Sequence, residues 1–101
     1  MTSSLSPAQC TSLADVRAEI DRLDRDIVRL LAERGQYVLA AAQFKRNDAE
    51  VQAPERVEQV IANVLRLAAD EGAIPDVVER GYRALIAAYT DAERAHREPR
   101  A

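Results

Sequence analysis

The residues of this chain best suited to chemistry are two cations, Arg34 and Lys45, and Lys45 is the only lysine among the 101 residues. They are eleven positions apart, about three turns and ~16 Å along a helix axis, so a continuous helix would direct both side chains to one face. Because a cation on a covered apolar face is costly unless an anion meets it, the pair predicts a binding site for a small polyanion. Arg34 interrupts an apolar series at alternating spacings of three and four: Leu13, Val16, Ile20, Leu23, Ile27, Leu30, Tyr37, Ala41 and Phe44.

Two further arginines are candidates for the same site. Arg17 precedes Arg34 by seventeen residues, ~25 Å along one helix, which is too far for both to hold one small ligand. Antiparallel pairing of two such helices would instead bring Arg17 of one copy toward Arg34 of the other. Arg56 lies near the start of a second helix, where the helix dipole disfavours a cation, and this favours a ligand-binding role.

Each cation also has an ordinary structural interpretation. Arg17 is flanked by acidic residues and would make a surface ion pair. Arg34 would pair with a carboxylate across an interface between two copies. Lys45 would be an accident of composition.

The apolar periodicity predicts an all-α fold of three helices, one long and two shorter, in one domain over residues 12–97. Ser12 and Asp15 predict a capping box at the start of the long helix, which we expect to run to about Arg46. The flanking segments are expected to be a flexible N-terminal arm over 1–11 and a disordered tail over 98–101.

Proline and glycine mark the two shorter helices. After a connection over residues 47–53, Pro54 is suited to a first helical position and Gly72 to the end of that helix. Pro75 opens the third helix, which should end near His96.

Two helices of roughly 18 residues can line the long helix on one side only. The opposite apolar edge would then remain in water, so we expect a homodimer in which the long helices of two copies pack together. This edge consists of Val28, Leu31, Val38, Leu39 and Ala42.

The composition excludes several function classes. A net charge of −3 argues against nucleic-acid binding, and no apolar run approaches the ~20 residues of a membrane span. One histidine and one cysteine, Cys10, cannot form a zinc cluster, and no glycine-rich phosphate loop is present. The single cysteine and the lack of a signal-peptide pattern in residues 1–10 predict a cytoplasmic protein. Cations without an evident nucleophile suit a reaction that needs orientation and electrostatic stabilisation.

These residues resemble the small, all-helical (type II) chorismate mutase family over nearly the whole chain. The resemblance is carried by Leu-Ala-Asp-Val-Arg at 13–17, Ile-Asp-Arg-Leu-Asp at 20–24, residues 27–34, Phe44-Lys45, and Ala-Pro-Glu-Arg at 53–56. The stretches at 10–17 and 53–57 are most similar to the isochorismate pyruvate lyase branch of the family.

The resemblance implies an intertwined homodimer with two equivalent sites and no cofactor or metal. Arg34, Lys45 and Arg56 would come from one chain, and Arg17 would be donated across the interface by the other. The arginines would bind the two carboxylates of the substrate, and Lys45 would donate to the ether oxygen whose bond breaks.

The resemblance also implies substrate contacts at Val57 and Tyr89 and a catalytic role for Glu93. Many mutases carry glutamate where this chain has Val57, a departure shared with the lyase branch. Glu93, one turn after Tyr89, stands where the family often has a glutamine that donates to the ether oxygen, so Glu93 would need a proton to help. The alternative is that Glu93 only pairs with Arg97.

The resemblance therefore implies a pericyclic enzyme that converts chorismate to prephenate, as in aromatic amino acid biosynthesis. The alternative reaction is the cleavage of isochorismate to salicylate and pyruvate, as in salicylate biosynthesis. The alternative of another class is a non-catalytic helical dimer that binds a partner or regulates one.

Overall fold

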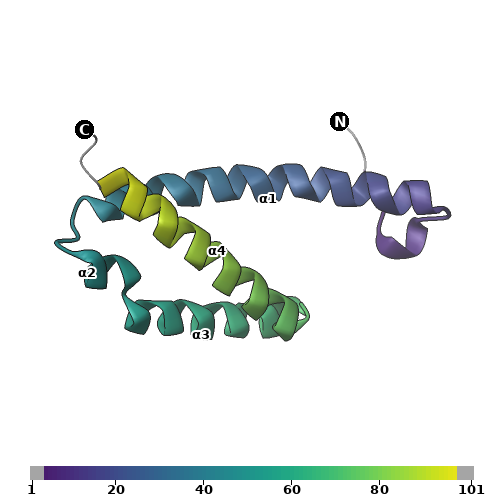
Figure 1. Ribbon diagram of the computed structural model, residues 1–101. Coiled ribbons are helices and arrows are strands. Elements are labelled where there is room, and N and C mark those ends of the chain that lie inside the picture. The colour runs from purple at the N-terminus through teal and green to yellow at the C-terminus, as the bar shows by residue number, and fades with distance from the viewer. Residues whose placement is uncertain (1–3, 98–101) are drawn as a thin grey trace. The chain divides into compact units, whose positions relative to one another are not determined.

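The computed structural model describes residues 4–97, and every regular element in that range is helical. This confirms the predicted all-α class, with the three expected helices present as α1, α3 and α4 (Figure 1). The chain divides into two compact units between Gln36 and Tyr37. The elements are the 3-10 helix η1 (Pro7–Gln9), α1 (Leu13–Ala42), α2 (Asp48–Gln52), α3 (Pro54–Glu71) and α4 (Pro75–Arg97).

The start of α1 is fixed by side-chain hydrogen bonds. The Ser12 Oγ accepts from the Asp15 amide at 3.0 Å, as the predicted capping box requires. The Asp15 carboxylate accepts from the amide and the hydroxyl of Thr11, at 3.0 and 3.1 Å, one residue earlier than in a standard box. These bonds hold the pKa of Asp15 below its ordinary value. The two hydrogen bonds from Thr11 also connect the start of α1 to the segment that follows η1.

The first unit leaves the apolar face of α1 uncovered. Six large apolar side chains along this helix are between 40% and 61% exposed: Leu13, Val16, Ile20, Leu23, Ile27 and Leu30. A row of this length is more than the scattered apolar exposure of an ordinary surface. The exposed row is therefore a surface suited to packing against another helix. It is not the edge that the sequence predicted to remain in water: of that edge Val28 is exposed, but Leu31, Val38 and Leu39 are half-buried and Ala42 is buried, so this prediction is wrong.

In the second unit, α1 ends at Ala42, so the predicted end at Arg46 is wrong by four residues. The amides of the next three residues donate to carbonyls three positions back, at 3.0–3.2 Å, instead of the four positions of an α-helix. This tighter turn ends the helix. Asn47 then caps a new helix, its side chain accepting from the Glu50 amide at 3.0 Å. Lys45 consequently follows α1 and does not lie on a continuous helix with Arg34.

The rest of this unit is built on the packing of α4 against α3 and α2 (Figure 1). The α3 helix begins at Pro54 and ends at Glu71, where Gly72 follows as the C-cap with a φ of +71° that suits glycine, and α4 begins at Pro75, as predicted. Among the described residues of this unit, the buried apolar ones are Ala42, Val51, Ile61, Val64 and Ala68. None of the described helices has the length and apolar content needed to cross a bilayer.

Candidate active site

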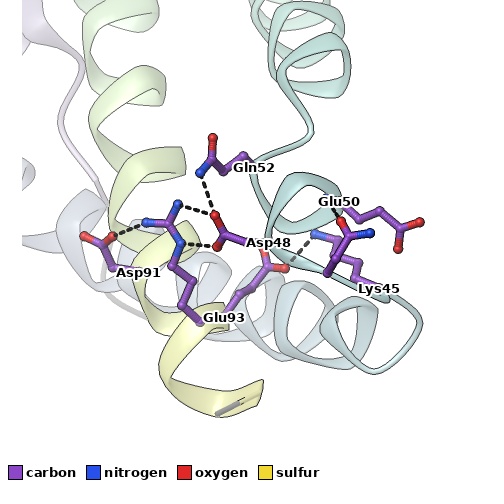
Figure 2. Close-up of polar contacts among 8 residues, drawn as sticks. Lys45, Asp48, Glu50, Gln52, Asp91 and Glu93 are labelled. Carbon is purple, nitrogen blue, oxygen red and sulfur yellow. Dashed lines mark hydrogen bonds and ion pairs between the residues drawn. The ribbon is translucent and has the colours of Figure 1, made fainter.

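The central contact of the candidate site joins Lys45 to Glu93. The Lys45 Nζ lies 2.6 Å from the Glu93 Oε2, and the two residues are 48 positions apart. Lys45 comes from the coil between α1 and α2, and Glu93 comes from the last turns of α4. Figure 2 shows the two side chains directed toward each other. The structure thus brings together the two residues that the sequence marks as catalytic.

Burial makes this contact chemically significant. The Glu93 side chain is 6% exposed and the Lys45 side chain 24% exposed. A carboxylate removed from water needs a partner, and the ammonium supplies one. Because an ammonium has three N–H donors, Lys45 can keep its bond to Glu93 and still donate to an oxygen atom of a ligand. Within this pair the Lys45 ammonium is therefore a positioned hydrogen-bond donor that carries a positive charge.

A second ion pair lies beside the first. The Arg94 Nε donates to the Asp48 Oδ1 at 2.6 Å, and a second guanidinium nitrogen donates to Oδ2 at 3.3 Å. The Gln52 amide also donates to Asp48, at 2.8 Å, as Figure 2 shows. Sequence reasoning missed Asp48 and Arg94, because a contact across 46 positions leaves no trace in periodicity.

Three predicted substrate-binding residues belong to the same unit as this pair. Arg56 lies in the first turn of α3, is exposed, and donates to the Gln59 side chain at 2.5 Å. Val57 is half-buried, and its amide donates to the Ala53 carbonyl at 3.1 Å. Tyr89 is half-buried on α4, one turn before Glu93. All three are held on helices, which fixes their backbone positions.

The remaining predicted residues belong to the first unit. Arg17 is exposed and Arg34 is half-buried, both on α1. The side chain of Arg97, the alternative partner of Glu93, lies outside the described residues. Among residues 4–97, no three histidine, cysteine, aspartate or glutamate side chains are grouped closely enough to hold a metal ion.

Comparison with known proteins identifies the family of this site. The family model for chorismate mutase type II matches residues 16–94. An isochorismate pyruvate lyase from Pseudomonas aeruginosa is 42% identical over 81 residues, which are 80% of this chain and 80% of the relative. A bifunctional chorismate mutase/prephenate dehydratase from Aquifex aeolicus is 36% identical over 56 residues, which are 54% of this chain and 16% of that protein. The chain belongs to the chorismate mutase type II family.

Proposed function

We propose that this chain is a pericyclic enzyme that acts on chorismate, or on its isomer isochorismate, through the ammonium of Lys45. The observation that carries the proposal is the Lys45–Glu93 pair, in which Glu93 holds the Lys45 ammonium, a hydrogen-bond donor, at a partly buried position in a member of this family. A pericyclic reaction needs no nucleophile or cofactor, so its catalysis rests on orientation and on stabilising the charge that develops.

The first candidate reaction is the rearrangement of chorismate to prephenate, which the family model supports. In this isomerisation the C–O bond of the ether breaks as a new C–C bond forms, and no atom enters or leaves. Negative charge develops on the ether oxygen while its bond breaks. A hydrogen bond from Lys45 to that oxygen strengthens in the transition state and lowers the barrier.

The two carboxylates of the substrate require cations beyond Lys45. We assign them to Arg34 and Arg56 of one chain and to Arg17 of a second copy. Arginine is suited to this role because its planar guanidinium can bind a carboxylate with two hydrogen bonds. The proposed homodimer is supported by the exposed apolar row along α1, which a second copy of this helix would cover.

A second candidate reaction is the cleavage of isochorismate to salicylate and pyruvate. Two observations favour it: the 42% identity to an isochorismate pyruvate lyase along most of both chains, and Val57 at a position where many mutases carry glutamate. This reaction also breaks the bond to the ether oxygen. The same ammonium of Lys45 would therefore serve both reactions.

The test is to offer the purified protein chorismate and isochorismate separately and to identify the products by chromatography. Formation of prephenate, or of salicylate with pyruvate, supports the proposal and identifies the reaction. If neither substrate is consumed, the non-catalytic helical dimer is the better description. A bicyclic dicarboxylate that mimics the transition state gives a check without turnover, because a ligand that binds only the folded state raises the melting temperature.

A further inference from the structure

The coil and α2 are joined to α4 by two ion pairs of opposite polarity. Lys45 supplies the cation and Glu93 the anion of one pair, while Asp48 supplies the anion and Arg94 the cation of the other. The first contact measures 2.6 Å, and the second consists of two bonds of 2.6 and 3.3 Å. A slip of this segment along α4 would bring like charges together, so the two pairs select one register.

Lys45 requires such support because of where it lies. Its backbone follows the end of α1 and precedes α2, and its side chain has four rotatable bonds. The α2 helix has five residues and is too short to be stable by itself, so packing and side-chain contacts must hold it. The buried Val51 anchors α2 through apolar contact, but such contact has little directional preference.

The Asp48–Arg94 pair fixes the orientation of α2 on α4, which the apolar contact of Val51 does not. A guanidinium that binds both oxygens of a carboxylate fixes their relative orientation, whereas a lysine acts as a point charge. Arg94 is further oriented by Asp91, whose Oδ1 lies 3.7 Å from its Nη1, and Asp48 by the amide of Gln52. We propose that Asp48 and Arg94 are positioning residues, which hold α2 on α4 so that the Lys45 ammonium stands at the reacting oxygen. This inference rests on the proposed function.

The chain contains a matched control for this proposal. Glu58 on α3 and Arg83 on α4 form a pair with two bonds, of 2.9 and 3.1 Å. Their side chains are 65% and 43% exposed, close to the 59% and 37% of Asp48 and Arg94. Both pairs join α4 to an earlier helix, but only Asp48 is three residues from Lys45. A purely structural role predicts the same consequences for the loss of either pair.

The test compares Asp48→Asn with Glu58→Gln, each of which removes one charge and little volume. We expect similar small changes in melting temperature, because exposed ion pairs contribute little to stability. Asp48→Asn should lower kcat by about 10- to 100-fold with KM nearly unchanged, because a small displacement of a catalytic group has effects of that size. Glu58→Gln should keep kcat within about twofold of the wild type. Arg94→Gln should lower kcat as much as Asp48→Asn does. The double variant Asp48→Asn/Arg94→Gln should lose no more kcat than either single variant.

Hydrogen exchange provides a readout that does not depend on turnover. The amides of residues 45–52 should exchange faster in Asp48→Asn and at the wild-type rate in Glu58→Gln. If the wild type turns over neither substrate, the proposed function fails, and this exchange still tests whether the pair holds α2. Full kcat in a folded Asp48→Asn or Arg94→Gln variant, or unchanged exchange in both, would overturn the inference.

Discussion

Lys45 and Glu93 are 48 residues apart in the chain, yet the Lys45 Nζ and the Glu93 Oε2 are 2.6 Å apart. Among the described residues, Glu93 is the one charged residue that is buried, with 5% of the surface of the whole residue exposed. The ion pair therefore has two consequences. It keeps a carboxylate satisfied at a covered position, and it fixes the ammonium that the proposed reaction needs.

The first consequence predicts that the single variant Lys45→Met is less stable than the double variant Lys45→Met/Glu93→Gln. Lys45→Met should lower the free energy of unfolding by about 2 kcal/mol, because it leaves the Glu93 carboxylate covered without its cation. Adding Glu93→Gln should recover at least half of that loss, since a neutral amide needs no counter-ion. Urea denaturation at fixed protein concentration measures both values. A double variant as unstable as Lys45→Met would show that the carboxylate is satisfied in another way.

The proposed homodimer predicts complementation between two inactive variants. Arg17→Ala and Lys45→Met each damage both sites of their own dimer. After mixing equal amounts and allowing exchange, half of the dimers contain one copy of each variant, and one of their two sites has both residues. The mixture should therefore show about one quarter of the wild-type activity. A mixture as inactive as the separate variants would contradict donation of Arg17 across the interface.

The Glu58–Arg83 contact predicts how stability depends on pH. Hydrogen bonds from Arg83 hold the pKa of Glu58 below its ordinary value of 4.5. The contact therefore stabilises the fold above that value, and the stabilisation is lost as pH falls through the lower pKa of the folded state. The difference in melting temperature between the wild type and Glu58→Gln should shrink between pH 6 and about pH 3. A constant difference would show that the carboxylate charge is not its source.

The helix ends were predictable where local chemistry determines them. Pro54, Gly72 and Pro75 mark their boundaries because proline suits a first helical position and glycine suits a positive φ. The end of α1 was not predictable in this way. The apolar spacing continues through Phe44, and the capping of α2 by Asn47 competes with a longer α1.

The candidate site was predictable where the resemblance supplied it. The resemblance put both Lys45 and Glu93 at the ether oxygen of the substrate, which implies that the two side chains lie close together, and the structure has them 2.6 Å apart. The pairing of Glu93 with Arg97 was the alternative that local spacing offered. Pairing across 48 positions depends on how α4 packs, so helical spacing alone does not give it. The same reason explains why Asp48 and Arg94 were not recognised, because each is an ordinary charged residue until the fold brings them together.

The central claim is that the Lys45 ammonium stabilises the breaking bond, and the most direct test is the kcat of Lys45→Met on whichever substrate the wild type consumes. Circular dichroism and sedimentation should first show that the variant is folded and in the oligomeric state of the wild type. Removing one donor to a developing oxyanion lowers kcat by about 10²- to 10³-fold, and the account predicts a loss at least as large. Wild-type kcat in folded Lys45→Met would contradict it.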